Sequence, residues 1–428
     1  MASSLLSRAG ARLGLDSGDF RISLLLCGLT CALMPAYTLR WHVGFYPTTV
    51  LEDAVALTLV AFAVESYGAR AVPSLRSPFS IAAAILLLAG AVSLAVAPDK
   101  RAALGIYRAY FVEPVVFFYV IGNVVRTPKR ASVLLAGLGV AGIVVSVANA
   151  FVVLDAIRHH VLNVVNTGPV AIFMNANDVP LFLVPLIAIA GSYLLYSRDR
   201  LERILSVGFI ALAVVATLLS FSRGGYLALA VVALGLAISH RRRWWLLGGA
   251  VAAAIVLILI PPINHRLAIE LDFSNGSNTL VGRFELWKAS LQMLSQHLIF
   301  GAGLSGFAAT LAPYWNPTHT DRFIYPHNIV LNFWSETGLL GVVAFAWIMV
   351  VGFRTSWLGS RQTSSPWRPL ELGILLALVG VIVHGLVDVP YFKNDLSLEF
   401  WTLIGLAWAG VRWTAPLSAA GVVKGSTG

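Results

Sequence analysis

The chain has 428 residues, of which 58% are hydrophobic and only 12% are charged, and its mean hydropathy is +0.81. A soluble domain carries about 25% charged residues, so the composition excludes an ordinary soluble enzyme and indicates a membrane protein. The formal net charge of +10 could indicate a nucleic-acid partner, but the basic residues cluster in alternate connections between apolar segments, which is typical of membrane topology.

Twelve apolar segments follow one another along the chain, many near the roughly 20 residues that a spanning helix needs. The sequence therefore predicts an all-α polytopic membrane protein with about twelve transmembrane helices, folded as a single integral membrane domain over residues 1–428. The first segment holds both cysteines, Cys27 and Cys31, which are too few for a disulfide framework or a metal site and are expected to pack. The predicted spans cover residues 22–39, 49–67, 80–97, 109–125, 131–154, 179–196, 203–220, 224–239, 244–262, 327–353, 369–387 and 396–413.

Most basic residues lie at the N-terminus and in every second connection, which by the positive-inside rule puts both termini in the cytoplasm. The basic residues predicted on the cytoplasmic side are Arg8, Arg12, Arg21, Arg70, Arg76, Arg126, Lys129, Arg130, Arg198, Arg200, Arg203, Arg241, Arg242, Arg243, Arg354, Arg361, Arg368, Arg412 and Lys424.

The longest outer connection covers residues 263–326, between the ninth and tenth predicted spans. Loops of this length in compact proteins are usually functional or disordered, and this one contains a helical pattern. Apolar residues recur there at helical spacing, which predicts an amphipathic helix lying over the outer surface. The residues of this predicted face are Leu280, Phe284, Trp287, Leu291, Leu294 and Leu298.

The stretch "YPHNIVLNFWSETGLLG", residues 325–341, follows this loop. A helix beginning near His327 would place Gly338 and Gly341 on the same stripe, where a lipid chain or another helix could approach closely. Glu336 would lie deeper in the membrane on the opposite face, and a buried acid there indicates a paired or functional group. On these residues alone, His327, Asn328 and Tyr325 could equally mark only the point where a helix leaves the bilayer.

Two arginines on the outer side point to an anionic substrate. Arg223 lies in the very short turn "FSRGGY", and Arg283 lies in "GRFELWKAS" of the long loop. Two convergent guanidinium groups suit a lipid-linked phosphate or pyrophosphate, because each planar fork binds phosphate oxygens with two hydrogen bonds. A snorkelling Arg223 and a solvated Arg283 are the simpler alternatives. Arg101 and Arg108, between the third and fourth spans, could assist.

Two further polar groups are expected at the same face. Asn175, Asn177 and Asp178 stand where the sixth span begins, and they could cap that helix or bind sugar hydroxyls. His384 precedes Asp388 by one helical turn near the outer end of the eleventh span, where the two could form a local pair or contribute to a site.

The sequence contains no metal-ligand spacing and no glycine-rich nucleotide loop. No cofactor is therefore expected. An outer-facing site would not meet nucleotide sugars, so a lipid carrier is the expected source of an activated group.

These motifs together resemble those of the O-antigen ligase and polymerase superfamily of bacterial membrane glycosyltransferases. The spacing of His327, Asn328, Gly338 and Gly341 is similar to the ligase signature. The segments "FSRGGYLAL", "GRFELWKAS" followed by "IFGAGLSGF", and "NANDVPLFL" are similar to other family segments.

The resemblance implies a GT-C-like architecture in the bacterial inner membrane and transfer of a glycan from undecaprenyl pyrophosphate on the periplasmic side, without metal. In ligases the acceptor is a lipid A–core sugar in lipopolysaccharide biosynthesis. His327 would then be the general base, with nearby arginines disfavouring its protonated form, and Arg223 and Arg283 would stabilise the leaving pyrophosphate. Attack opposite the leaving group would invert the anomeric centre. The other expected substrate-binding residues are Asn328, Asn175, Asn177, Asp178, Arg101, Arg108, Tyr325, Gly338, Gly341, His384 and Asp388.

Two alternatives stay open at this point. Polymerases, which join lipid-linked repeat units, share the arginine-rich outer loops, and the histidine motif is the main reason to favour a ligase. A secondary transporter of an anionic solute would also have twelve helices and intramembrane acids, although the chain shows no half-to-half match of the kind many transporters have.

Overall fold

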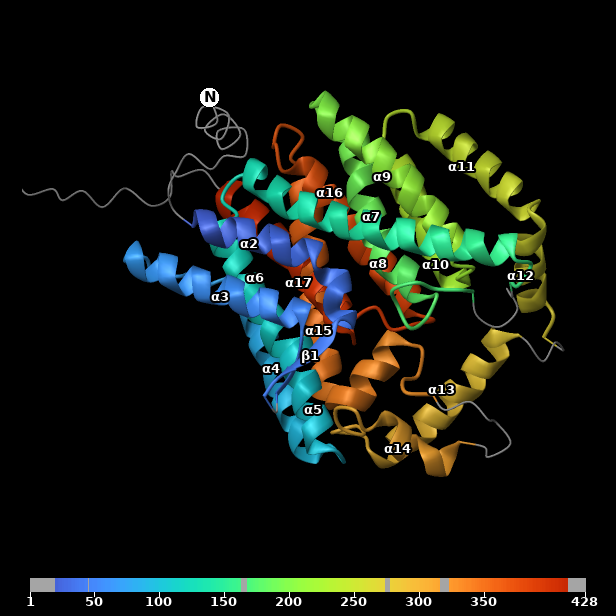
Figure 1. Cartoon of the computed structure of the whole chain (residues 1–428), viewed down its shortest axis with the longest axis horizontal. Coiled ribbons are helices and arrows are strands. Elements are labelled where there is room, and N and C mark those ends of the chain that lie inside the picture. The colour runs from blue at the N-terminus through green and yellow to red at the C-terminus, as the bar shows by residue number, and fades with distance from the viewer. Residues whose placement is uncertain (1–19, 45, 163–167, 274–277, 316–322, 415–428) are drawn as a thin grey trace, which may run out of the picture.

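The structure is a computed structural model, and it describes residues 20–44, 46–162, 168–273, 278–315 and 323–414. The predicted cytoplasmic residues Arg8, Arg12 and Lys424 lie outside these ranges. Within them the chain is almost entirely helical (Figure 1). The helices are α2 (Arg21–Ala32), α3 (Val50–Gly68), α4 (Ser80–Val96), α5 (Lys100–Ile106), α6 (Glu113–Val124), α7 (Pro128–Arg158), α8 (Asp178–Tyr196), α9 (Arg200–Leu219), α10 (Arg223–Ser239), α11 (Arg243–Ile258), α12 (Pro261–Leu271), α13 (Thr279–Gln296), α14 (Phe307–Leu311), α15 (Ile329–Arg361), α16 (Arg368–Gly385) and α17 (Asn394–Thr414), with short helical turns η1 (Met34–Thr38), η2 (Tyr107–Val112) and η3 (Ala312–Tyr314).

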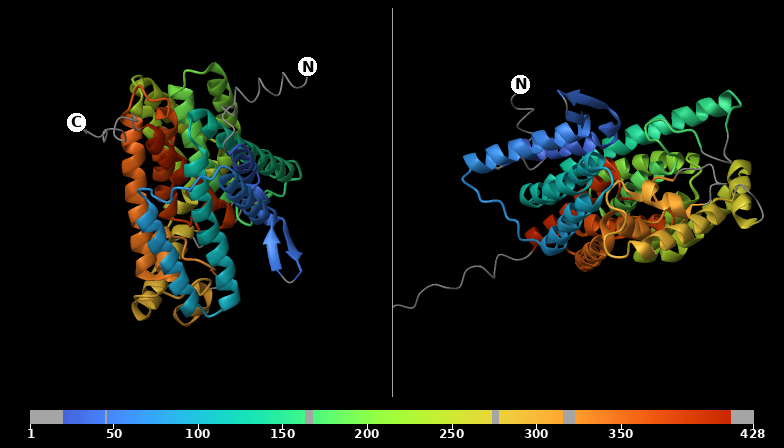
Figure 2. Two further views of the ribbon diagram at one scale, coloured as in Figure 1. Left: turned by 90° about the vertical axis from the view of Figure 1, so that its left-hand side faces the viewer. Right: turned by 90° about the horizontal axis from the view of Figure 1, so that it is seen from below.

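Strands β1 (Arg40–Val43) and β2 (Tyr46–Thr49) pair antiparallel, with Arg40 opposite Thr49. This hairpin projects from the side of the helical bundle (Figure 2). The side chain of Thr49 then caps α3 by accepting a hydrogen bond from the Glu52 amide at 3.1 Å, which ends the strand and begins the helix.

Each of the twelve predicted apolar segments coincides with a helix, and the prediction of an all-helical polytopic membrane protein is confirmed at that level. This agreement does not establish that all twelve segments cross the membrane. Within the described residues, six helices are long and apolar enough to cross a membrane, or seven if the bent pair α11 and α12 crosses as one. These six are residues 100–124, α7, α8, α9, α15 and α16.

Helices α8 and α16 form the antiparallel centre of the bundle, and both are largely buried by other helices. Gly373 and Gly380 of α16 allow close packing, because a Cβ atom at these positions would meet Ile189 and Val184 of α8 at 2.7 Å and 3.2 Å. The first residue of α8 and the last residues of α16 therefore lie at one end, hereafter the site end. The other end, hereafter the Arg368 end, is where the Arg368 guanidinium covers the Tyr196 ring at 4.3 Å.

The long connection between α11 and α15 contains the predicted helix as α13, but the buried face differs from the predicted one. Leu286, Met293 and Leu294 are buried against Phe307 and Leu311 of the same connection. By contrast, about half of the surface of Phe284, Leu291 and Leu298 is exposed. The helix carries two apolar faces, and spacing along the sequence cannot tell which of them meets the protein.

Helix α15 begins at Ile329, two residues later than the sequence predicts, and it is broken at Gly338. The φ angle of Gly338 is 67°, a left-handed conformation that favours glycine. The amide of Leu339 there donates to the carbonyl of Ile299 at 3.0 Å, and a Cβ atom on Gly338 would collide with that carbonyl oxygen. The segment "IFGAGLSGF" thus packs into the break in α15.

Gly338 therefore does admit a close approach, and the segment that makes it is the outer loop at Ile299 and Phe300 rather than a second helix. Gly338 and Gly341 are both buried, and the nearest side chain to Gly341 is that of Thr337 in the same helix. Glu336 is buried as expected, and its carboxylate accepts a hydrogen bond from the Ser305 amide at 2.6 Å. The kink and this acid hold the outer loop against the bundle, which gives both features a structural role.

Candidate active site

His327 lies two residues before the first residue of α15, not on the first turn of that helix as the sequence predicts. Its φ angle is 49°, a strained conformation for a residue with a side chain. The next residue, Asn328, caps the helix by accepting hydrogen bonds from the amides of Val330 and Leu331 at 3.0 Å and 3.1 Å. Its amide nitrogen donates to the carbonyl of Leu386 at 3.0 Å. Asn328, predicted to bind substrate, thus ties His327 to the segment that follows α16.

The side chain of His327 faces Asp388 in that segment. His327 Nδ1 and Asp388 Oδ1 are 3.3 Å apart. Burial alone would raise the pKa of the Asp388 carboxyl, but His327 and the neighbouring Arg283 hold that pKa below its usual range. Asp388 is therefore ionised and only accepts hydrogen bonds. In the neutral tautomer that donates from Nδ1 to this carboxylate, Nε2 has the lone pair that a general base needs.

Arg283 is the cation nearest to this pair. Its Nη2 lies 3.8 Å from Asp388 Oδ2, and burial lowers its pKa while Asp388 acts in the opposite direction. One turn further along α13, Trp287 Nε1 donates to the carbonyl of Pro326 at 2.9 Å. This contact fixes the helix that carries Arg283 against the residue next to His327. Two predicted catalytic residues, His327 and Arg283, thus meet at one carboxylate.

Arg223 is linked to the region of His327 and Arg283 through an acidic partner that the sequence did not predict. It begins α10 after a turn of three residues, and its guanidinium forms an ion pair with Glu270 of α12. Glu270 also accepts hydrogen bonds from the amides of Thr279 and Leu280, both at 3.1 Å, at the start of α13. Arg223 is thereby linked to the helix that carries Arg283. Glu270 is one of two acids in the segment "AIELDF", and nothing in that segment predicted this role.

His384 lies close to this cluster but does not form the predicted local pair with Asp388. Only 2% of its surface is exposed, and neither ring nitrogen has a hydrogen-bond partner within the described residues. The backbone of Gly224, next to Arg223, packs against its ring. Within the described residues, the ion pairs of Asp388 are with His327 and Arg283, and its Oδ1 also accepts a hydrogen bond from the Val389 amide at 2.9 Å.

A second polar group borders His327 through Tyr325. The two rings meet edge to face with their centroids 4.7 Å apart, and the Tyr325 side chain is hydrogen-bonded to that of Asn175. The amide of Asn175 donates to Asp178 Oδ2 at 3.2 Å, and the amide of Asn177 donates to Asn175 Oδ1 at 3.0 Å. The predicted segment 175–178 is thus a turn before α8 that lies beside the histidine.

Asp178 also forms an ion pair with Lys393, which sequence reasoning missed. Asp178 is 2% exposed, so its charge needs a buried partner. Lys393 lies five residues after Asp388 in the segment "DVPYFKND", and this closeness in sequence could have identified it as a site residue. A third cation, after Arg283 and Arg223, is therefore held at the site end.

Arg101 and Arg108 do not join His327. Arg108 pairs with Glu52 at 2.8 Å and with Glu113 at 3.5 Å, while Arg101 is exposed on α5. Glu52 also accepts a hydrogen bond from Asn394, next to Lys393, at 2.9 Å. Arg108 therefore belongs to a neighbouring charge network at the same end. Arg322, another basic residue of the outer loop, lies outside the described residues.

The geometry brings together an imidazole oriented by a buried carboxylate and cations from three separate elements. Such a pair can remove a proton from a hydroxyl group, and fixed cations can stabilise a leaving group that gains negative charge.

Comparison with known proteins identifies one family. Residues 208–346 match the family model described as O-antigen ligase. The matched segment contains Arg223, Arg283 and His327, and Asp388 lies beyond it. No curated protein matches the chain.

Proposed function

We propose that the chain belongs to the O-antigen ligase family, whose model matches residues 208–346, and that it performs the transfer reaction of a ligase. It is a multi-pass membrane glycosyltransferase that moves a glycan from undecaprenyl pyrophosphate to a sugar of lipid A–core. The observation that carries the proposal is the His327–Asp388 pair beside Arg283, since its parts are those that glycosyl transfer to a hydroxyl group requires.

In this reaction the acceptor hydroxyl attacks the anomeric carbon of the lipid-linked glycan. His327 Nε2 takes the hydroxyl proton, a new C–O bond forms, and the bond to the pyrophosphate oxygen breaks with its electron pair. Asp388 stays ionised, holds Nδ1 and stabilises the imidazolium that results. Attack from the face opposite to the leaving group inverts the anomeric centre.

The arginines act on the pyrophosphate. Arg283 contacts the same carboxylate as the base, which holds a positive charge beside His327. Arg223 can bind a phosphate oxygen while it keeps Glu270, because a guanidinium has five N–H donors. Neither role needs a metal ion.

The site faces the periplasm in this proposal. Arg198, Arg200, Arg203, Arg361 and Arg368 lie at or beside the opposite end of the central helices, and the positive-inside rule assigns such an end to the cytoplasm. In that orientation the donor lipid approaches the site end from the outer leaflet.

A reconstituted assay tests the reaction and the acceptor together. The purified chain in vesicles receives lipid-linked glycan and either lipid A–core or a second lipid-linked unit. Transfer to lipid A–core is expected. Transfer only to the second lipid-linked unit would make the protein a polymerase, and no transfer to either acceptor would contradict the proposal.

A further inference from the structure

The Arg368 end of the central helices contains a polar cavity of about 350 Å³ beside an apolar groove of about 640 Å³. The cavity includes Lys129, Arg198 and Arg368, and the groove lies between α7, α8 and α9. Ser132, Tyr193 and Glu202 line both. The polar cavity and the apolar groove therefore share one wall. Both lie at the Arg368 end of α16, about 27 Å along that helix from the site end.

The groove has the length of one membrane leaflet. On α7 it runs from Ser132 to Ile143, which is about 17 Å of helix, close to half of a hydrocarbon core of about 30 Å. Protein does not fill it at two positions on its walls. A Cβ atom added to Gly139 or to Gly208 would meet no atom within 4 Å.

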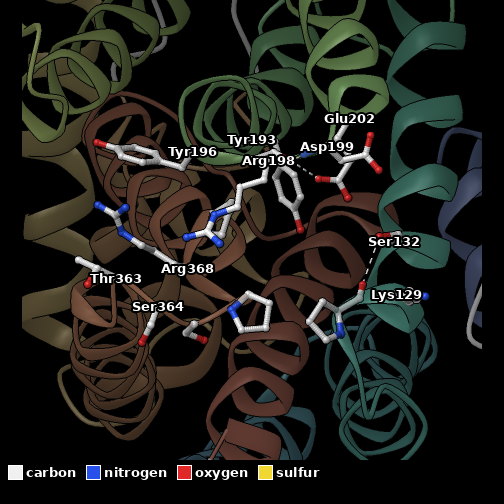
Figure 3. Close-up of a pocket in the computed structure, with 15 residues that line it drawn as sticks. Lys129, Ser132, Tyr193, Tyr196, Arg198, Asp199, Glu202, Thr363, Ser364 and Arg368 are labelled. Atoms are coloured by element: carbon white, nitrogen blue, oxygen red, sulfur yellow. Dashed lines mark hydrogen bonds between the residues drawn. The ribbon is translucent and has the colours of Figure 1, made fainter.

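Two of the three cations in the cavity, Lys129 and Arg198, have exposed side chains that make no hydrogen bond or ion pair within the described residues, whereas Arg368 contacts Ser360 and Tyr196. Asp199 accepts a hydrogen bond from the Leu201 amide at 2.7 Å, and Glu202 accepts one from the Ser197 hydroxyl. Arg198 reaches toward the middle of the cavity, between Arg368 and Ser132 (Figure 3).

We propose that this combined cavity and groove binds one anionic glycerophospholipid of the cytoplasmic leaflet. Arg198 binds its phosphate from the middle of the cavity, Lys129 adds positive charge at the cavity margin (Figure 3), and one acyl chain lies in the groove along Gly139 and Gly208. The charge selects the ligand, because basic pockets between helices on the cytoplasmic side recognise anionic head groups. The site is distinct from the catalytic one and does not depend on the proposed reaction.

The test uses the full-length chain, purified in detergent and stripped of lipid. Dioleoylphosphatidylglycerol or dioleoylphosphatidylcholine is added, so that the acyl chains are identical and only the head-group charge differs. Native mass spectrometry measures the bound lipid, and thermal unfolding measures the Tm. The anionic lipid is expected to bind about tenfold more tightly and to raise the Tm more than the zwitterionic lipid does. Equal binding of both lipids would overturn the proposal.

Two double variants locate the site. Lys129→Gln with Arg198→Gln should remove the preference for the anionic lipid. Gly139→Leu with Gly208→Leu should weaken the binding of both lipids, since leucine side chains would fill the groove.

The matched control removes two other exposed cations, Arg200→Gln with Arg241→Gln, which line neither the cavity nor the groove. It should keep the preference of the unchanged protein. If the control loses the preference to the same extent, or if Lys129→Gln with Arg198→Gln keeps it, the lipid responds to general surface charge and the assigned site is wrong. Even if one variant does not fold, comparing the binding of the two lipids to the unchanged protein still tests the proposal.

Discussion

The two ends of the α8–α16 pair carry the same kinds of side chain in opposite states. At the site end, Asp178 and Asp388 are almost fully buried, and each has a cation within reach. At the Arg368 end, Lys129 and Arg198 are exposed beside an apolar groove. The difference shows that charge alone does not indicate chemistry in a membrane protein. In our proposals, the buried and paired charges hold a reacting group in position, whereas the exposed cations bind a lipid head group.

The largest effect is expected from the base at the site end. An amide cannot accept a proton at neutral pH, so His327→Gln should lower transfer by on the order of 10⁴ while expression and Tm stay near those of the unchanged protein. The same substitution at the Arg368 end, His240→Gln, is the matched control and should leave transfer within about twofold. Initial rates with saturating donor measure both.

Binding of the lipid-linked donor decides what His327 does. A general base does not contribute much to donor affinity, so His327→Gln should bind the donor normally. Loss of donor binding would instead make His327 a phosphate ligand. Retention of most activity would move the base to another residue, with Asp178, Glu336, His384 and Asp388 as the next candidates.

The next effect concerns the carboxylate that orients the base. Asp388→Asn should lower turnover by on the order of 10³, because the imidazole loses both its orientation and the partner of its positive charge. The affinity for the lipid-linked donor should stay near that of the unchanged protein, because Asp388 acts through His327. Asp199→Asn, which retains a helix-capping side chain, is the control. Turnover within about twofold of the unchanged protein would show that Asp388 has only a structural role.

Substitution of either arginine should lower turnover less than substitution of His327 or Asp388, and the loss should depend on the planar shape of the guanidinium group. Arg223→Ala and Arg283→Ala should each lower turnover by on the order of 10², as for removal of one electrostatic stabiliser. Lysine at either position should not restore the full rate, because the two-pronged contact is lost. Arg241→Ala at the Arg368 end removes an exposed arginine and should have no comparable effect. Near-normal turnover by both alanine variants would contradict the pyrophosphate role.

The smallest effect is expected from metal removal. The base, the carboxylate and the cations account for every step of the proposed reaction, so EDTA should leave the transfer rate unchanged. Rates are compared before and after chelation and after return of Mg²⁺ or Mn²⁺. A loss that either ion restores would show that a metal takes part.

Local sequence patterns predicted the positions of the helices and several of the important residues. Apolar segments of spanning length coincide with helices, since exposed peptide groups cannot be left unpaired in lipid. His327 was singled out by the resemblance to the ligase signature and Arg283 by its place in the outer loop, and the structure brings both to Asp388.

Several relations depend on contacts between segments that are far apart in the chain. The pairing of His327 with Asp388 rather than of His384 with Asp388 is one, and the pairing of Arg223 with Glu270 is another. The break of α15 at Gly338 is a third, because it requires the carbonyl of Ile299. Spacing along a helix reports neighbours within three or four residues only.

The sequence by itself determined that the chain is helical, apolar and basic in alternate connections, because these properties follow from the residues of each segment and their local hydrogen bonding. Only the tertiary structure decided which carboxylate meets which cation, which face of α13 is buried, and where an unfilled groove adjoins exposed charges. The reason is that a buried charge must find a partner wherever the fold provides one, and that partner comes from whichever helix packs there.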